Sequence, residues 1–335
     1  MLYCLYSRPE RGEAMIRYLR EAFSPIEDAV VASRLIRPAG GVRDVVLDTD
    51  TYNEIDDQYA LAYLVRSQES CRIRAITAAP FYGKPEWKRP VRSDSPADGM
   101  QKSYDEILRV LRMMDREDLE PLVYRGSETY LPGPLVPVRS EAAEAIIRCA
   151  SGHSPGNPLY VMALACLTNV ASALLLDPTL RERIMVVWLG GHAHHFGTCD
   201  DFNCRQDIDA SRIVMGCGVP LVQLPLFGVI SHFSFCKPEL QSLFGGKNAL
   251  CDYLVDSTLG FMKQKFPYEH WSKPLWDICV AAWVVNPDFF LDRIAPAPVP
   301  QYDETYAFLP DTPPLRYVYY VYKDALVGDM LRKLT

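Results

Sequence analysis

The sequence predicts an α/β fold in which an open, mostly parallel sheet carries helices on both faces. Two observations support this prediction. Short apolar runs alternate with runs of helical periodicity along most of the chain, which is typical of parallel strands joined by crossover helices. In addition, 49% of the 335 residues are hydrophobic, which is enough to fill a core on both faces of such a sheet.

Six strands are expected, because each is an apolar run that ends at polar residues, glycine or proline. They cover residues 45–50, 71–80, 121–126, 158–169, 183–192 and 219–226. Helices are expected between them at residues 56–67, 103–114, 141–151, 169–178 and 207–218, the third capped by Ser140. Residues 81–99 are polar and rich in proline, which predicts a long functional loop. The C-terminal third is more mixed.

The N-terminal segment is expected to stand apart from the rest of the chain. Residues 9–24 have the pattern of an amphipathic helix, and Pro38 to Gly41 mark a break before the first strand. No internal repeat or linker divides the remainder. We therefore expect an N-terminal extension with a helix over residues 1–40 and a single domain over residues 41–335.

Composition argues against several classes of function. A formal net charge of −7 argues against general nucleic-acid binding. No apolar run approaches the ~20 residues of a membrane span, and the apolar start, which ends at Tyr6, is too short for a signal peptide. The ten cysteines form no C-x-x-C pair and indicate reduced thiols. A soluble, cytoplasmic protein is expected.

Four aspartates gather where the first expected strand ends, in VVLDTDTYNEIDDQ: Asp48, Asp50, Asp56 and Asp57. Ligands of open parallel sheets bind beyond the carboxyl ends of the strands. Carboxylates this close repel one another unless a hard cation, a proton or hydrogen bonds compensate. Favourable acids in the first turn of a helix account for Asp56 and Asp57, but they do not account for Asp48 and Asp50.

One enzyme class with such a strand end is the haloacid-dehalogenase-type phosphotransferases. LDTDTY is similar to their D-x-D motif, in which both aspartates lie near Mg²⁺. Tyr52, however, stands where that class usually has a small or β-branched residue. The adjacent pair of Asp56 and Asp57 also has no role in that motif.

A second resemblance is more specific. VVLDTDTYNEIDDQYAL resembles the signature of nucleoside hydrolases, a strand followed by D-x-D-x-x-x-D-D, although five residues instead of three separate Asp50 from Asp56. Four further segments resemble later family motifs in the expected order: ALACLTNVASAL, VVWLGGH, DFNCRQDIDA and LWDICVA. The resemblance spans about residues 43–325 and implies a nucleoside-hydrolase-like, Rossmann-like fold in a divergent member.

The resemblance also implies a calcium site. Its ligands are expected to be Asp50, Asp57, the carbonyl of Thr168 and Asp277, an all-oxygen set that suits a hard cation. Asp50 is expected to take the proton of the water that attacks C1′ of the sugar. The transition state should resemble an oxocarbenium ion.

The same resemblance assigns residues to the sugar. Asp56 and Asn203 are expected to hold ribose hydroxyls, and Asp201 to reach the 5′ end. Asp277 is expected to contact substrate as well as metal. Asp48 is expected to orient the turn from behind the site.

The leaving-group side departs from the family pattern. Many members place a His before the final Asp, where Trp276 stands here. Phe81 and Tyr82 occupy the region of a sugar-binding Asn after the second strand, and Thr198 is the nearest candidate for another. His195, in the run HAHH, is a candidate for the missing acid. The metal centre is therefore expected to be kept and the leaving-group pocket to be rebuilt.

These residues predict hydrolysis of the N-glycosidic bond of a ribonucleoside or related ribosyl compound. The aromatic residues either stack on a purine or accompany a different ribosyl or sugar substrate. The alternatives are a sugar- or nucleoside-binding protein of the same fold without turnover, and a D-x-D phosphotransferase. The two-residue insertion, at Asn53 and Glu54, is either a solvent-facing bend or a contact to metal or substrate. The resemblance also implies a homodimer or homotetramer.

Overall fold

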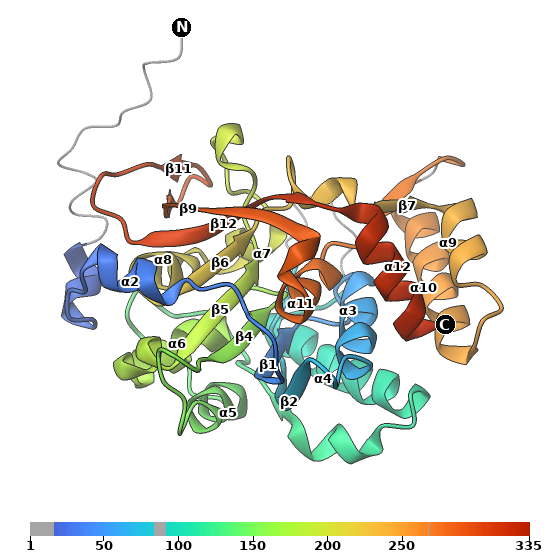
Figure 1. Cartoon of the computed structure of the whole chain (residues 1–335), viewed down its shortest axis with the longest axis horizontal. Helices are drawn as coiled ribbons and strands as arrows, with labels where there is room; N and C mark the ends of the chain where they lie inside the picture. Colours follow the sequence, from blue (N-terminus) through green and yellow to red (C-terminus); the bar gives the residue numbers. More distant parts are fainter. Residues whose placement is uncertain (1–16, 84–91, 267) are drawn as a thin grey trace, which may run out of the picture.

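A computed structural model describes residues 17–83, 92–266 and 268–335 of the chain and contains one large sheet (Figure 1). Its strand order is β3-β2-β1-β4-β5-β6-β12-β9, and neighbouring strands are parallel except for the pair of β12 and β9. The strands are β1 Arg43–Thr49, β2 Cys71–Ala78, β3 Val123–Arg125, β4 Leu159–Ala163, β5 Ile184–Leu189, β6 Leu221–Leu224, β9 Phe290–Pro296 and β12 Pro314–Val321. The predicted mostly parallel α/β fold is confirmed.

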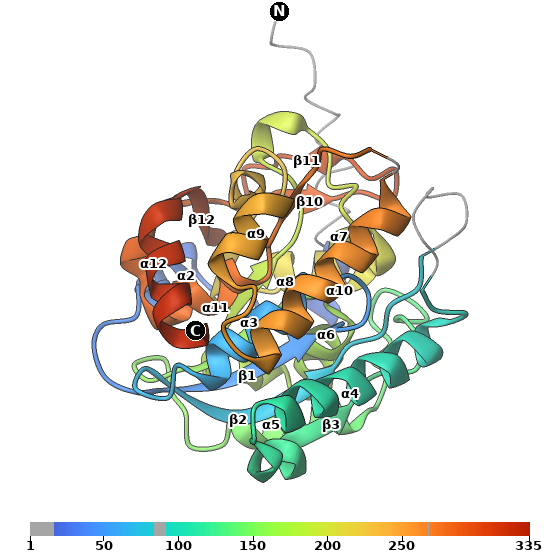
Figure 2. The same cartoon turned by 90° about the vertical axis from the view of Figure 1, so that its right-hand side faces the viewer.

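Helices cover both faces of this sheet. Helices α5 (Glu141–Cys149), α6 (Thr168–Leu176) and α8 (Ile208–Gly216) pack in a row on one face. Helices α4 (Pro96–Met113), α3 (Asp56–Val65), α11 (Ile278–Val285) and α12 (Lys323–Leu334) form the other row. The remaining helices are α2 Asp28–Arg34, α7 Phe202–Gln206, α9 Lys237–Leu243 and α10 Ala249–Lys265, of which α9 and α10 lie in front of α3 in Figure 2.

Short elements connect these layers. Short 3₁₀ helices occur at η1 Tyr18–Glu21, η3 Glu117–Leu122, η4 Pro178–Glu182, η5 His194–Phe196, η6 Ile230–His232 and η7 Pro287–Phe289. Two small antiparallel ribbons pair β7 (Ser234–Cys236) with β8 (Ser272–Pro274), and β10 (Val299–Pro300) with β11 (Tyr306–Ala307). Both ribbons lie outside the main sheet.

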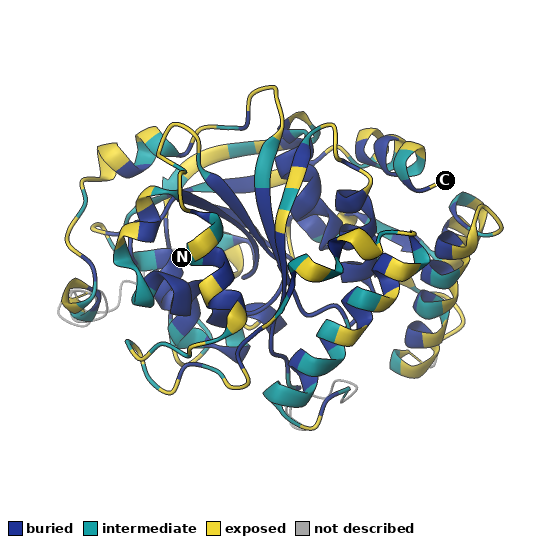
Figure 3. Cartoon of the chain, turned by 90° about the horizontal axis from the view of Figure 1, so that it is seen from below, coloured by how far each residue is buried: buried dark blue, intermediate teal, exposed yellow. Residues whose placement is uncertain are grey.

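The core lies between the sheet and its two helix layers, as the dark strands of Figure 3 show. Every residue of β4 and β5 is buried. Strands covered on both faces need continuous apolar runs instead of alternating ones, which explains the character of these segments in the sequence. Trp188 on β5 and Trp283 on α11 are among the largest fully buried side chains.

Most expected elements of the first two thirds are present. Ser140 caps α5 as predicted, and its Oγ accepts a hydrogen bond from the backbone N–H of Ala143 at 3.2 Å. Helix α4 begins earlier than expected, inside the predicted loop 81–99, because Pro96 starts the helix and Ser95 caps it through the N–H of Asp98 at 3.1 Å. Residues 84–91 of that loop lie outside the described residues.

The N-terminal and C-terminal segments differ more from expectation. The first half of the helix expected over residues 9–24 lies outside the described residues, and the second half contains the 3₁₀ helix η1. Helix α2 follows instead. Leu19 and Phe23 are buried in the main core. The aromatic run YVYYVY belongs mostly to β12, where Tyr317 is buried and Tyr319 exposed.

Across the described ranges, no helix is both long and apolar enough to cross a membrane.

Candidate active site

A small cavity of about 30 Å³ lies beyond the carboxyl ends of β1, β4 and β5. This volume holds a cation or about two water molecules. The residues that line it are Asp50, Asn53, Glu54, Asp56, Asp57, Leu164, Leu189, Phe202, Asn203, Leu226, Trp276 and Asp277. The structure thus brings together most of the acids that the sequence singled out, from two segments of the chain.

The turn between β1 and α3 places the first acids of the cavity. The carbonyl of Asp50 accepts a hydrogen bond from the N–H of Asn53 at 2.7 Å, which bends the chain directly after the strand. Asp56 and Asp57 then form the first turn of α3. The positive end of the helix dipole favours carboxylates at this position.

The carboxyl groups at the cavity are almost fully withdrawn from solvent. Asp50 and Asp57 are 2% exposed, and Asp277 is 5% exposed. Burial, and after it the charge of Asp56, raise the pKa of Asp57 to about 7. Burial, followed by the charge of Asp57, raises the pKa of Asp50 and of Asp277 well above the ordinary value. The site therefore favours neutral acids unless a cation is present.

These carboxyl groups are arranged in a way that fits a metal ion. One carboxylate oxygen from each of Asp56, Asp57 and Asp277 lies within 4.8 Å of the others. Oδ2 of Asp50 is buried and has no hydrogen-bond partner among the described residues. A buried oxygen of this kind costs free energy unless a ligand compensates it. Several carboxylate oxygens around one small cavity are the donor set of a hard divalent cation.

Asp57 and Asp56 differ in their own contacts. Oδ1 of Asp57 accepts a hydrogen bond from the hydroxyl of Thr49 at 2.5 Å. Asp56 is held at both oxygens, since Oδ1 contacts Nζ of Lys273 at 2.8 Å and Oδ2 accepts the N–H of Trp276 at 2.9 Å. Asp56 is therefore fixed by protein donors on two sides.

Two residues at strand ends line the cavity, Leu164 directly after β4 and Leu189 at the end of β5. Leu164 lines the cavity, and its oxygen accepts a hydrogen bond from Nδ2 of Asn203 at 2.6 Å. Thr168, the carbonyl ligand expected from sequence, begins α6 and does not line the cavity; its hydroxyl donates to Asp207 at 2.6 Å. The end of β4 at Ala163 is the local signal that would have pointed to Leu164.

Asn203 and Asp201 occupy different places. Nδ2 of Asn203 bridges the carbonyls of Leu164 and Leu189, at 2.6 and 3.0 Å, and thereby joins the ends of β4 and β5. Asp201 does not line the cavity. It caps α7 and accepts the N–H of Gly191 at 2.7 Å. The glycine is required there, because its φ is +72° and a Cβ would meet the hydroxyl of Tyr306.

Aromatic side chains surround the side of the cavity next to Trp276. The indole N–H of Trp276 donates to Ser231 at 3.2 Å. The ring of Phe227 meets Trp276 edge-on, with 6.4 Å between ring centroids, and stacks on His192 at 4.6 Å. Phe227 is 48% exposed, so this aromatic group reaches the surface.

Three other candidates from the sequence lie away from the cavity. Phe81 is buried, and its carbonyl accepts the hydroxyl of Ser93. His195 is exposed beside Phe196. The hydroxyl of Thr198 donates to the carbonyl of Glu304. None of the three lines the cavity, whereas His192 reaches its aromatic side through Phe227.

Asp48 lies behind the cavity. Its Oδ1 accepts hydrogen bonds from the hydroxyl of Thr77 at 2.6 Å and from Nδ2 of Asn169 at 2.9 Å. Burial raises its pKa to about 6. The side chain thus joins β1 to β2 and to α6, which is the geometry of an orienting residue.

Comparison with known proteins identifies the family. The inosine-uridine preferring nucleoside hydrolase family matches residues 45–308, which include every segment that lines the cavity. The chain belongs to this family.

This nucleoside hydrolase family member is similar to proteins of several sources. The pyrimidine-specific ribonucleoside hydrolase RihA of Escherichia coli O9:H4 (strain HS) is 25% identical over 273 residues, which are 73% of this chain and 80% of the relative. Two solved structures have the same fold at a TM-score of 0.68. They are the plant nucleoside hydrolase PpNRh1, 18% identical with 88% and 99% of the two chains covered, and the purine-preferring ribonucleoside hydrolase from Gardnerella vaginalis, 16% identical with 87% and 98% covered.

Proposed function

We propose that this chain hydrolyses the N-glycosidic bond of a ribonucleoside or related ribosyl compound with a calcium-activated water, releasing ribose and a base. The observation that carries the proposal is the cluster of buried carboxyl groups around a cavity of about 30 Å³ at the carboxyl edge of the sheet. Membership of the nucleoside hydrolase family supports the hydrolase over the phosphotransferase alternative.

The residues present fit a calcium ion. Asp50, Asp57, Asp277 and the carbonyl of Leu164 would hold it, and the buried Oδ2 of Asp50 would gain the partner that it lacks among the described residues. Three carboxylates and a carbonyl are ligands of the kind that calcium prefers. A bound calcium would lower the pKa of a coordinated water and orient the sugar hydroxyls.

Asp50 is the proposed base. It lines the cavity directly after β1, on a turn that the Asp50–Asn53 hydrogen bond fixes, so its carboxylate is placed by the backbone. A base positioned in this way takes the proton of the attacking water as that water approaches C1′. Asp56 and Asn203 then hold ribose hydroxyls, and nearby carboxylates stabilise the positive charge that develops on the sugar.

The proposed leaving-group side is the aromatic group of Trp276, Phe227 and His192. Trp276 lines the cavity and stands directly before Asp277, in the position where many family members place a His. An aromatic ring favours a flat heterocycle by stacking. We propose a nucleobase, purine or pyrimidine, as the leaving group.

The decisive experiment is a panel of purine and pyrimidine nucleosides and other ribosides, with release of free ribose as the measurement. Asp50→Asn keeps the shape of the side chain but removes the base, so we expect at least about a hundredfold loss of kcat. Asp177→Asn, at an exposed cap of η4, is the matched control and should retain activity. Chelation of calcium should abolish turnover reversibly. Absence of ribose release from every compound contradicts the proposal.

A second candidate is a ribosyl-binding protein of the same fold without turnover. The observation that favours it is that both oxygens of Asp56 already hold protein donors, Lys273 and the backbone of Trp276. Calorimetric binding of ribose or a riboside, with no hydrolysis of any compound in the panel, would support this candidate.

A further inference from the structure

A buried lysine lies beside the acids of the candidate active site. Lys273, on β8, is 2% exposed. Its Nζ lies 2.7 Å from Oε2 of Glu54, 2.8 Å from Oδ1 of Asp56 and 4.2 Å from the ring centroid of Trp276. Burying an ammonium group is costly unless carboxylates compensate it, and here two do. The resemblance to the family assigned no role to Lys273.

The insertion in the turn supplies one of these carboxylates. Glu54 belongs to the two residues by which the turn exceeds the common family spacing, and its Oε1 contacts Nζ of Lys265 at 2.7 Å. Positive and negative side chains therefore alternate in one row, in the order Lys265, Glu54, Lys273 and Asp56. The insertion is not only a solvent-facing bend, since Glu54 is 8% exposed and lines the cavity.

The segment that carries Lys273 fixes Asp56 at both oxygens. β8 pairs with β7, with Lys273 opposite Phe235, and this pairing holds the backbone of Lys273 in place. Three residues later the N–H of Trp276 donates to Oδ2 of Asp56. Asp56 is therefore positioned by one short stretch of chain, residues 273–276.

The acids of the cavity fall into two groups by charge. Asp56 and Glu54 share the ammonium group of Lys273. Asp50, Asp57 and Asp277 form no ion pair with a lysine or arginine among residues 17–83, 92–266 and 268–335. The second group is the one that the proposed function assigns to calcium.

We propose that Lys273 is a positioning residue that acts as the built-in counter-ion of Asp56. It holds Asp56 toward the sugar and out of the metal's coordination shell, so that calcium is left to Asp50, Asp57 and Asp277. Its positive charge also weakens calcium binding by repulsion. This inference rests on the calcium site of the proposed function.

The test is calorimetric titration with Ca²⁺ alone, without any riboside. Lys273→Met keeps the length of the side chain but removes its charge, so we expect calcium to bind about tenfold more tightly. Glu54→Gln removes one carboxylate and should weaken binding by a similar factor. The double variant restores the net charge and should bind calcium as the unchanged protein does. A lysine with only a packing role would not produce opposite signs that cancel.

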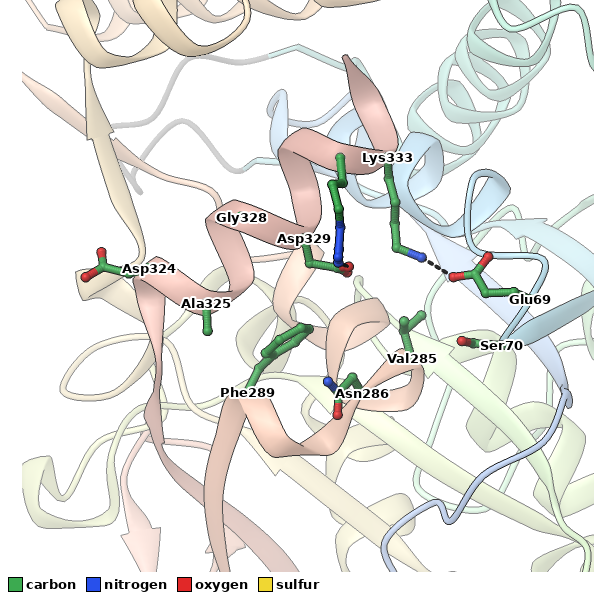
Figure 4. A pocket seen from close by; sticks show the side chains of 11 residues that line it. Glu69, Ser70, Val285, Asn286, Phe289, Asp324, Ala325, Gly328, Asp329 and Lys333 are labelled. Atoms are coloured by element: carbon green, nitrogen blue, oxygen red, sulfur yellow. Dashed lines mark hydrogen bonds and ion pairs between the residues drawn. The ribbon is translucent and has the colours of Figure 1, made fainter.

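The matched control is Lys333→Met, which breaks another lysine–glutamate pair. Lys333 contacts Glu69 next to the start of β2, at the opposite edge of the sheet (Figure 4). Its side chain is also largely buried, at 11% exposed. We expect calcium affinity to remain unchanged in this variant.

Two outcomes overturn the inference. One is a folded Lys273→Met protein, shown by its circular dichroism and melting curve, that binds calcium no more tightly than the unchanged protein. The other, which stands even if Lys273→Met does not fold, is unchanged calcium affinity in Glu54→Gln. Riboside turnover is measured separately. If calcium affinity changes in the variants as expected but no riboside is hydrolysed, the proposed function is overturned and the inference about Lys273 is not.

Discussion

Asp57 and Asp48 show how strongly the site depends on a ligand. Both are buried, and burial is the first cause that raises their pKa, to about 7 and about 6 respectively. An unfolded aspartate titrates near pH 4. Between these values the folded, calcium-free protein binds more protons than the unfolded chain. The carboxyl groups therefore leave stability unaffected below about pH 4, where both states are protonated, and destabilise the fold increasingly as pH rises from about 4 to 7.

We predict that the calcium-free protein loses on the order of 2 kcal/mol of unfolding free energy between pH 5 and pH 8. Urea unfolding after removal of divalent cations measures this change. Asp57→Asn should reduce the dependence, because one of the groups that titrate over this range is gone. Saturating calcium should also flatten it, because the ion keeps the carboxylates charged. An unfolding free energy that rises over this range would contradict the prediction.

At the scale of single residues, the sequence predicted which acids lie close together where they belong to recognisable motifs at strand ends and helix starts. Asp50, Asp56, Asp57 and Asp277 come together at one cavity as expected. Lys273 could not be found in this way, because its ion-pair partner Asp56 is 217 positions away and the short segment SKP has no periodicity. The proposed role of the Leu164 carbonyl had no signal in the sequence, because a backbone oxygen has no sequence signature apart from the end of its strand.

At the scale of elements, Asn169 connects several parts of the sheet. Its Nδ2 donates to Asp48 on β1 and to the carbonyl of Ala78 on β2, at 2.9 and 3.3 Å. Its Oδ1 accepts the N–H and the hydroxyl of Ser127, which follows β3. One side chain on α6 thus holds the ends of three strands, and all of these groups are buried.

We predict that Asn169→Ala destabilises the protein by about 2–3 kcal/mol, because it leaves the buried N–H and hydroxyl of Ser127 without their acceptor and removes one of the two donors to Oδ1 of Asp48. Urea unfolding is the measurement. Asn157→Ala, at an exposed turn, should stay within about 0.5 kcal/mol of the unchanged protein. Equal effects of the two substitutions would show that Asn169 does not connect the strands.

Elements were predictable where the chain alternates between strand and helix. The strands from β1 to β6 lie inside or close to their expected ranges, because buried parallel strands are continuous apolar runs. The C-terminal third breaks this alternation. β9 is antiparallel, β7 and β8 form a separate ribbon, and α10 is not followed by a strand of the main sheet. A local sequence pattern cannot show which distant strand a segment pairs with.

On the scale of the whole molecule, the proposed calcium ligands come from the ends of β1 and β4, from α3 and from the start of α11. A calcium ion at these ligands binds only the folded chain, because the ligands lie far apart in the unfolded chain. Binding therefore stabilises the whole fold by mass action.

We predict that calcium at about a hundred times its Kd raises the unfolding free energy by about 2.7 kcal/mol. The melting temperature with and without calcium measures the effect. Asp277→Asn should abolish most of the increase, whereas Asp177→Asn should retain it. A melting temperature that does not respond to calcium would contradict the assignment of the metal site.

The position of β12 in the sheet has a consequence for how the chain folds as it is synthesised. In the complete sheet, β12 (residues 314–321) lies between β6 and β9. During synthesis, β6 (residues 221–224) is made earlier than β12 and has no partner on that side until β12 follows. Until then the edge of β6 presents unpaired backbone groups, which attract other strands. A nascent chain that stalls before β12 is therefore exposed to aggregation at this edge, although all of its proposed calcium ligands have already been made.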